Sequence, residues 1–292
     1  AEESGANYLF EASVGGGIPI IRPLCQCLAA NYIEGIAGIL NGTTNFILTM
    51  MIEEGMSFEE ALKIAQEKGY AEKDPTADVE GHDACRKVCI LASLAFGKHV
   101  YPNQVETEGI TNISLEDVSY IENAGGVIKL LGQIKYINDN EIAAFVSPAV
   151  VYNGSQLASV KDVFNAILVR GDAVGDVCFY GPGAGKLPTA SAVVADIIDC
   201  AKHSDRKKIF GWGEGSENYV VDYKEKIEMP FYVRAKATPN EVNSKFADVK
   251  FLSRKGQPSD EVAFITDYMT ENELNKKLDG MNVINTIKVT NY

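Results

Sequence analysis

The sequence contains few of the residues that build metal cages and disulfide frameworks. His82, His99 and His203 are the only histidines, and they are too scattered to form a metal cage. The cysteines follow neither a zinc-site spacing nor a disulfide framework. We therefore expect free thiols in a reducing cytoplasm. The six cysteines are Cys25, Cys27, Cys85, Cys89, Cys178 and Cys200.

Long apolar runs and positive charge are also scarce. No stretch of 18 or more apolar residues occurs, so no transmembrane helix is expected. The formal net charge is −13, whereas nucleic acid and anionic membrane surfaces attract a basic face. The balance of 46% hydrophobic and 23% charged residues is typical of a soluble globular protein. We therefore expect neither nucleic acid nor a membrane as a partner.

The N-terminus has neither a starting methionine nor the features of a signal peptide. It begins with Ala1, Glu2 and Glu3, and no basic or apolar stretch precedes Tyr8. We therefore expect a processed or trimmed chain, or a part of something longer. The 292 residues are nevertheless enough for two ordinary domains.

The first forty residues predict two strands around one helix. Residues 8–17 resemble a short strand that ends in a turn of three glycines. Pro19 suits the first turn of a helix that continues to about Ala30. Residues 33–40 predict the second strand.

The next segments predict three helices from their capping residues. Thr43 or Thr44 can cap the first, and Ser57 with Glu60 forms a capping box for the second. Asp78 can cap the third, which is long and apolar.

The second half of the chain predicts an α+β fold, in which helices cover a mixed sheet. Residues 125–182 contain several β-rich segments separated by turn residues, and residues 188–203 predict a helix. Residues 211–227 resemble a linker between a domain at 1–210 and a smaller one at 228–292. The smaller domain has a strand-helix-strand-strand-helix-strand rhythm.

The helix after Asp78 carries the first candidate for chemistry. Asp83 and Lys87 are four residues apart, so they share one side of a helix that is apolar around most of its circumference. An ordinary surface ion pair at this spacing contributes only about 0.2–0.5 kcal/mol. A desolvated lysine loses its proton more easily and can therefore act as a general acid. The residues alone leave both interpretations open.

The connector before this helix is rich in carboxylates. Glu72, Asp74, Asp78 and Glu80 can converge on Lys87, hold a substrate ammonium group and direct a proton. The alternative is a solvated acidic loop, which is the more common case. Asp78 has a second possible role as the helix cap.

Two glycine-rich segments allow the backbone to approach a ligand closely. Residues 15–17 lack the surroundings of a dinucleotide fingerprint, because no βαβ unit ending in an acidic residue follows. Residues 181–186, GPGAGK, are too short for a phosphate loop, and Leu187 stands where Ser or Thr is required. The second segment does lie between a strand and a helix N-terminus, where anions bind well.

Four long segments resemble homoserine dehydrogenases, and they occur in the right order over about the first 205 residues. The resemblance implies reduction of aspartate 4-semialdehyde to homoserine with NADPH or NADH. It makes Lys87 the proton donor and assigns Glu72, Asp83 and Asp78 to the substrate, with Gly42 and Thr43 lining the pocket. The four segments are residues 10–24, 38–48, 65–97 and 163–199.

The same resemblance implies further binding sites. It assigns Glu11, Val14, Gly16 and Ile18 to a sodium ion, largely through backbone oxygens, which suit a hard cation. It also brings Gly183, Ala184 and Gly185 close to the cofactor. Residues 228–292 resemble an ACT domain, the small ferredoxin-like regulatory module that binds an amino-acid effector such as threonine. The family further implies a homodimer or homotetramer.

Three departures from the family pattern stand out. The nucleotide-binding Rossmann domain would precede Ala1, so we expect the chain by itself to be inactive. Lys186 replaces a usual glycine. Asn240 replaces the glycine of the effector turn, which puts threonine binding in doubt.

These departures leave three functions open. The first is the substrate and regulatory portion of a homoserine dehydrogenase. The second is a dimerisation and amino-acid-binding module without catalysis, and the third is a related semialdehyde or amino-acid dehydrogenase.

Overall fold

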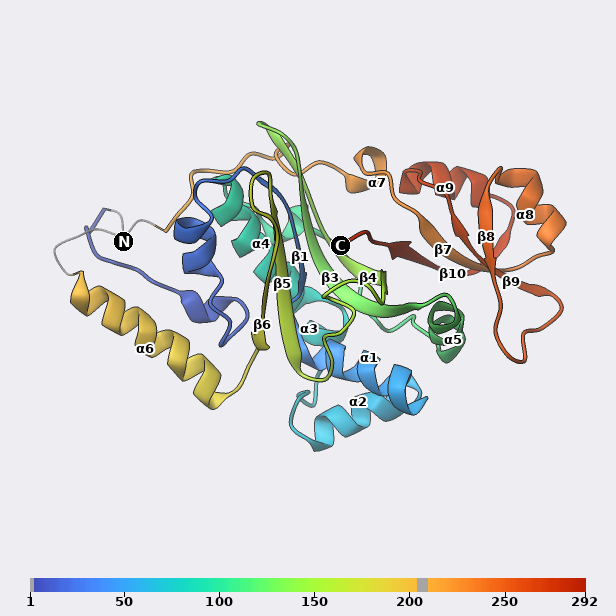
Figure 1. The fold of residues 1–292 in the computed structure, drawn as a ribbon, viewed down its shortest axis with the longest axis horizontal. Coiled ribbons are helices and arrows are strands. Elements are labelled where there is room, and N and C mark those ends of the chain that lie inside the picture. The colour runs from blue at the N-terminus through green and yellow to red at the C-terminus, as the bar shows by residue number, and fades with distance from the viewer. Residues whose placement is uncertain (1–2, 204–209) are drawn as a thin grey trace.

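The computed structural model describes residues 3–203 and 210–292, and its architecture is mixed α and β (Figure 1). One large sheet extends through the molecule, with its strands in the order β6-β5-β1-β3-β4-β10-β7-β9-β8 and with β2 pairing β4. The strands are β1 (Ile33–Ile39), β2 (Glu106–Thr107), β3 (Gly126–Asn138), β4 (Glu141–Tyr152), β5 (Phe164–Gly171), β6 (Gly175–Pro182), β7 (Phe231–Lys236), β8 (Val249–Leu252), β9 (Glu261–Thr266) and β10 (Asn282–Val289).

The helices lie on both faces of this sheet, and none that the structure describes is long and apolar enough to cross a membrane. The α-helices are α1 (Gly42–Glu54), α2 (Phe58–Glu67), α3 (Thr76–Val79), α4 (His82–Phe96), α5 (Leu115–Asn123), α6 (Lys186–Lys202), α7 (Tyr223–Lys226), α8 (Pro239–Lys245) and α9 (Glu271–Leu278). Three shorter helical turns are η1 (Glu11–Ser13), η2 (Pro23–Cys27) and η3 (Pro102–Gln104).

The long hairpin of β3 and β4 forms the centre of the molecule. Its strands are buried along most of their length, as expected for strands that are covered on both faces. Helices α1, α4 and α5 pack on one face, and the segment carrying Leu157 and Val160 packs on the other. This core fixes the end of β1 and the first turns of α1 and α4 at one edge.

The C-terminal strands and helices follow the β7-α8-β8-β9-α9-β10 order that the sequence predicts. Strand β10 pairs with β4 in parallel through Lys288 opposite Ala149 and Val289 opposite Val150, so the sheet is continuous into this unit. The proposed linker at 211–227 follows residues 204–209, which lie outside the described residues. The division into domains therefore stays a prediction.

A buried network of charged side chains, here called the buried network, joins α5 to the C-terminal strands. Asp117 is fully buried, forms an ion pair with Arg234 at 2.9 Å, and accepts hydrogen bonds from Tyr232 Oη at 2.9 Å and Asn285 Nδ2 at 2.8 Å. Glu261 accepts hydrogen bonds from Tyr120 and Arg254, each at 2.9 Å. Burial and the bond to Glu261 raise the pKa of Tyr120 to about 12. The network's members are Asp117, Tyr120, Tyr232, Arg234, Arg254, Glu261 and Asn285.

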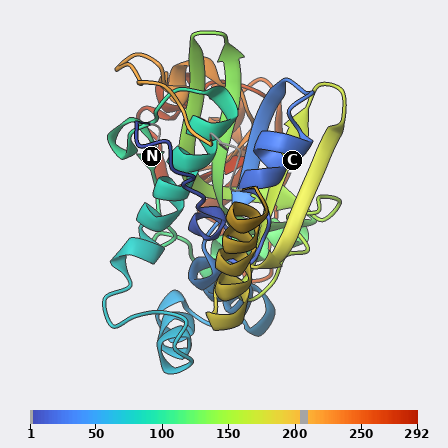
Figure 2. The same cartoon turned by 90° about the vertical axis from the view of Figure 1, so that its left-hand side faces the viewer.

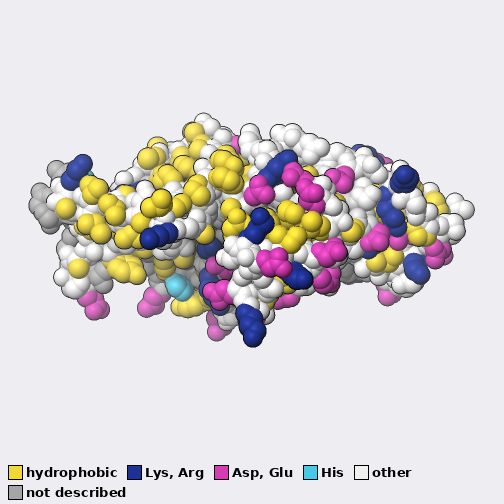
Figure 3. Space-filling model, turned by 90° about the horizontal axis from the view of Figure 1, so that it is seen from below, with side chains coloured by type: hydrophobic (Ala, Val, Ile, Leu, Met, Phe, Trp, Pro, Cys, Tyr) yellow, Lys and Arg dark blue, Asp and Glu magenta, His cyan; other side chains and the backbone are white. Residues whose placement is uncertain are grey.

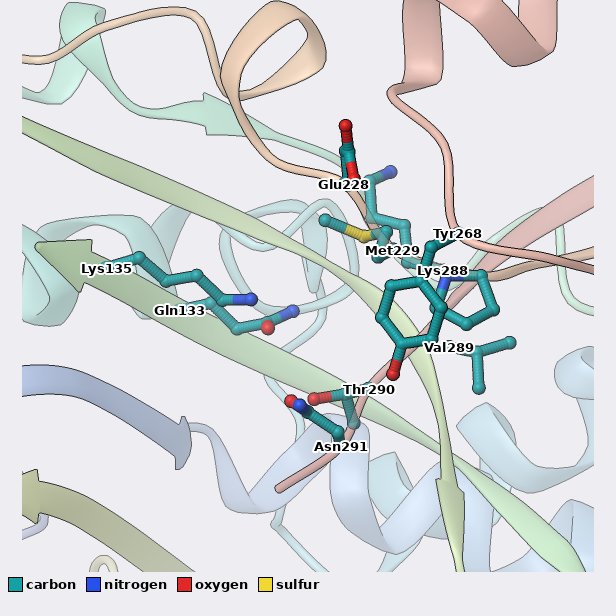
Figure 4. Close-up of a pocket in the computed structure, with 10 residues that line it drawn as sticks. Gln133, Lys135, Glu228, Met229, Tyr268, Lys288, Val289, Thr290 and Asn291 are labelled. Atoms are coloured by element: carbon teal, nitrogen blue, oxygen red, sulfur yellow. The ribbon is translucent and has the colours of Figure 1, made fainter. Parts of the chain in front are cut away.

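A small cavity lies where β10 joins the central hairpin (Figure 4). Gln133 and Lys135 of β3 line one side, and Tyr268 and the residues around Thr290 line the other. Its volume is about 30 Å³, room for one or two water molecules. It is therefore too small for a substrate.

Helix α6 stands outside the sheet and packs on the N-terminal segment (Figures 1 and 2). Arg22 pairs with Asp196 of α6 at 3.5 Å, and the backbone N–H of Glu11 donates to Asp196 at 2.9 Å. The outer side of α6 exposes apolar side chains, part of the hydrophobic surface at the left of Figure 3. These residues are Leu187, Val193, Val194, Ile197 and Ile198.

The strand expected at residues 8–17 is wrong, and the helix expected from Pro19 to Ala30 is too long. The first segment forms η1, and the second forms a short helix that includes η2. The reason is Glu11, whose buried carboxylate accepts hydrogen bonds from the N–H groups of Ile20 and Ile21 at 2.6 and 2.7 Å. A residue from outside the helix thus satisfies its first donors.

Two predicted helix caps are also wrong, although the capping box of Ser57 and Glu60 is confirmed. Asn41, not a threonine, caps α1 by accepting a hydrogen bond from Thr44 N at 2.9 Å. Asp78 lies within the separate turn α3, and Gly81 precedes α4. The φ of +81° at Gly81 turns the chain between α3 and α4, which moves Asp78 away from the helix start.

Candidate active site

A cavity of about 690 Å³ lies where β1 ends and where α1 and α4 begin. The structure brings together around it all the residues that the sequence assigned to catalysis, substrate and cofactor. Their individual roles remain predictions. The lining residues are Asn41, Gly42, Thr43, Lys68, Gly69, Tyr70, Glu72, Asp74, Ala77, Asp78, Asp83, Arg86, Lys87, Val163, Gly183, Ala184 and Gly185.

Lys87 and Asp83 form the ion pair that their spacing predicts. The Lys87 Nζ lies 2.6 Å from Asp83 Oδ2 and donates a second hydrogen bond to the carbonyl of Leu40 at 2.8 Å. Their side chains are 19% and 32% exposed, so the pair borders the cavity instead of being buried outright. Two of the three ammonium N–H groups have partners among the described residues. The third is available to a ligand.

Asn41 ties the carboxylates of this site together. Its Nδ2 donates hydrogen bonds to Asp78 Oδ1 at 2.7 Å and to Asp83 Oδ2 at 2.9 Å. Sequence reasoning missed this residue, because an Asn before a helix also fits an ordinary turn. We call Asn41, Asp78, Asp83 and Lys87 the cavity cluster.

The first turn of α1 is fitted closely to its surroundings. A Cβ at Gly42 would lie 2.8 Å from the carbonyl oxygen of Val163, so a larger residue would displace the backbone here. The hydroxyl of Thr43 donates to the carbonyl of Tyr70 at 2.6 Å. This bond fixes the connector that carries Glu72 against the start of α1.

Three of the four predicted carboxylates line the cavity, and the fourth does not. Glu72, Asp74 and Asp78 contribute to its wall. Hydrogen bonds from the hydroxyl and the N–H of Thr76 lower the pKa of Asp74, which favours its charged form. Glu80 is absent from the lining and lies 3.4 Å from the hydroxyl of Thr111. The expectation that all four converge is therefore wrong for Glu80, since α3 points it elsewhere.

The loop Gly183–Gly185 forms the opposite wall of the cavity. A Cβ at Gly183 would lie 2.2 Å from the side chain of Asn165, and one at Gly16 would lie 2.3 Å from the Gly183 carbonyl oxygen. Gly17 N donates to Pro182 O at 3.1 Å, so the two glycine segments of the sequence meet here. Lys186 begins α6 and is not among the lining residues. Its side chain therefore does not block a ligand from approaching the backbone of the loop Gly183–Gly185.

The four residues assigned to sodium lie in the N-terminal loop around η1. The carboxylate of Glu11 already accepts hydrogen bonds from the N–H groups of Ile20, Ile21 and Arg22 and from Arg22 Nε at 3.0 Å. Gly15 and Gly16 have φ of +70° and +53°. Val14 and Ile18 are buried. Among the described residues, no group of three or more His, Cys, Asp or Glu could hold a metal, so a cation here would depend on backbone oxygens.

Comparisons with known proteins identify the family. A family model described as homoserine dehydrogenase matches residues 19–198. The homoserine dehydrogenase of Synechocystis sp. is 50% identical over 202 residues, which are 68% of this chain and 47% of that protein. The chain thus spans about half the length of the curated relatives it matches.

Solved structures agree over a larger part of the chain. A homoserine dehydrogenase from Thiobacillus denitrificans superposes with a TM-score of 0.87 and 36% identity, over 99% of this chain and 72% of that one. A hyperthermophilic archaeal homoserine dehydrogenase mutant in complex with NADPH gives a TM-score of 0.58 and 32% identity, over 69% and 58%. The chain belongs to the homoserine dehydrogenase family.

Proposed function

We propose that the protein carrying this chain interconverts L-homoserine and L-aspartate 4-semialdehyde with NADP or NAD. The observation that supports this most directly is the cavity cluster, where Lys87 keeps one N–H for a ligand beside Asp83 and Asp78. The product would serve the biosynthesis of threonine, methionine and isoleucine in the cytoplasm.

The carboxylates suit the amino-acid part of the substrate. Glu72, Asp78 and Asp83 bind the ammonium group of homoserine, since opposite charges at short range favour both ionised forms. The backbone at Gly42 and Thr43 borders the same space. Lys87 then lies beside the substrate oxygen, donates its proton during reduction and takes it back during oxidation.

The loop Gly183–Gly185 lines the same cavity as Lys87, and its small side chains let a cofactor approach the backbone closely. When bound, the nicotinamide cofactor supplies the hydride for reduction. Gly183, Ala184 and Gly185 contact it here, while the rest of its site belongs to a domain outside this chain. The exposed apolar side of α6 directly after this loop is consistent with such a covering domain.

The N-terminal loop suits a sodium ion held by backbone oxygens of Glu11, Val14, Gly16 and Ile18. Positive φ at Gly15 and Gly16 gives this loop a tight backbone turn that residues with a Cβ rarely adopt. Oxygen ligands of this kind suit a hard cation.

The C-terminal unit is proposed to be an ACT domain that binds an amino-acid effector, with threonine as the first candidate. Its element order and its strand order β10-β7-β9-β8 support this assignment. The protein would act as a homodimer or homotetramer.

Lys87→Ala tests the proposal in the full-length gene product that carries this chain. We expect the turnover number for homoserine oxidation to fall by about 10²–10⁴-fold, because the general base is lost. The matched control is Lys63→Ala, an exposed lysine of α2 away from the cavity. Near-normal turnover by a folded Lys87→Ala variant, judged by its thermal unfolding, would show that the proton-transfer assignment is wrong.

A further inference from the structure

The side-chain amide of Asn41 has a fixed orientation in the cavity cluster. Its Oδ1 accepts a hydrogen bond from Thr44 N at 2.9 Å, while its Nδ2 faces two carboxylates, which can only accept. The residue is 6% exposed. One side chain therefore caps α1 and also donates to Asp78 and Asp83.

The two hydrogen bonds from Asn41 reduce the repulsion between the carboxylates of Asp78 and Asp83. Two carboxylates that share one neighbourhood repel each other unless a donor stabilises their charges. A bridging cation would hold them but would also neutralise them. An amide donates two hydrogen bonds and carries no charge, so both carboxylates keep their attraction for a substrate cation.

The bridge also extends to Lys87. The oxygen Asp83 Oδ2 that accepts from Asn41 lies 2.6 Å from the Lys87 Nζ. The second acceptor of Lys87 is the carbonyl of Leu40, the residue just before Asn41. The end of β1 and the cap of α1 thus set the direction of the ammonium group from two sides.

We propose that Asn41 is a positioning residue for proton transfer. It fixes the carboxylates of Asp78 and Asp83, and through Asp83 it orients Lys87 toward the reacting oxygen. This inference rests on the proposed function. A role limited to capping α1 is the alternative.

Asn41→Asp separates the two roles. Asp caps helices as well as Asn, so the cap of α1 is kept. The added charge at a position that is only 6% exposed should lower the melting temperature, so turnover is measured below the unfolding transition of the variant. The variant replaces both donors with an acceptor and adds a negative charge to a wall that already contains Glu72, Asp74, Asp78 and Asp83, with Lys68, Arg86 and Lys87 as the cations. We expect the turnover number to fall at least about 10-fold, since the bridge and the aim of Lys87 are lost.

The pH profile adds a readout that capping alone would not change. In homoserine oxidation Lys87 must be unprotonated, and an added neighbouring negative charge favours its protonated form. The acid limb of the plot of turnover number against pH should therefore shift to higher pH by about one unit in Asn41→Asp. Asn41→Ser keeps a capping hydroxyl without the reach or the charge. It should lose activity without the upward move.

The outcomes are distinct. Wild-type turnover and an unchanged acid limb in a folded Asn41→Asp variant, with turnover also unchanged in Asn41→Ser, would overturn the positioning role. If Asn41→Asp fails to fold, Asn41→Ser decides by its turnover alone. Failure of the proposed function would instead appear as an active Lys87→Ala variant. A failed positioning role leaves Lys87→Ala inactive and Asn41→Asp active.

Discussion

The cavity cluster and the buried network use the same kinds of residue in different surroundings. In the buried network, Asp117 and Glu261 are 0% and 8% exposed, and Arg234 and Arg254 balance their charges. In the cavity cluster, Asp83 pairs with Lys87 while Asp78 accepts a hydrogen bond from the uncharged amide of Asn41, and the ion pair is open to the cavity. The difference is one of charge balance as well as burial.

The comparison separates structural charges from binding charges. A buried ion must be matched, because an unmatched one costs several kcal/mol. A cavity can keep an unmatched carboxylate, since solvent stabilises it until a ligand cation arrives. Excess charge of one sign at a cavity wall therefore indicates the charge of the ligand, here a cation such as the ammonium group of an amino acid.

Arg234→Met should give the largest effect on stability. It leaves Asp117 buried without its counter-charge, and we expect a loss of about 3–5 kcal/mol in the free energy of unfolding. Urea unfolding of the 292-residue chain measures this loss. The matched control is Lys236→Met on the same strand, where the side chain is 58% exposed and lies 3.8 Å from Asp260. A loss below about 1 kcal/mol for Arg234→Met would show that the charges of the buried network need no matching partner, contrary to the distinction drawn between the two clusters.

Lys129 lies between the two clusters in character. It is buried like the members of the buried network, but its two hydrogen-bond partners, Asn45 and the carbonyl of Val160, are uncharged. Burial lowers its pKa to about 8. Between pH 8 and about 10.4 the unfolded chain then binds more protons than the folded one, so stability rises with pH in this window.

Relative to Lys129→Met, the wild type should gain at most about 3 kcal/mol as the pH rises through that window. Urea titrations at pH 7 and pH 10 measure the gain, with the exposed Lys63→Met as control. A difference between wild type and Lys129→Met that does not change with pH would show that the amine is not desolvated.

Asp83→Asn should have the smallest effect on stability. The side chains of Lys87 and Asp83 are 19% and 32% exposed and border the cavity. Ion pairs that are open to solvent contribute little, so the free energy of unfolding should change by less than about 1 kcal/mol. The affinity for homoserine should nevertheless fall at least about 10-fold, because one ammonium partner is lost. Calorimetric titration of homoserine into both chains tests this. A loss of 3 kcal/mol in stability would place Asp83 with the buried charges.

Local patterns were enough to predict much of the fold. The β-rich segments that became β3 and β4 and the capping box at Ser57 depend on residues close together in the chain. The helical period alone placed Asp83 beside Lys87. These features need no knowledge of where distant segments lie.

The missed features depend on contacts between distant residues. Asn41 acquires its role only because Asp78, 37 residues away, folds back onto it. Glu11 was expected to lie in a strand, but its carboxylate caps a helix that starts nine residues later. Asp117 fits an ordinary capping box at the start of α5, and nothing local reveals that Arg234 will bury it.

The contact between the N-terminal loop and α6 has a consequence for synthesis on the ribosome. Glu11 finds Asp196 across 185 residues of chain, and Gly16 meets Gly183 over a similar span. At about 5–20 residues per second, the first segment waits roughly 10 to 40 s for its partner to emerge. Until then Glu11 lacks its partner on α6, and the wall of the cavity that contains Gly183, Ala184 and Gly185 cannot be completed.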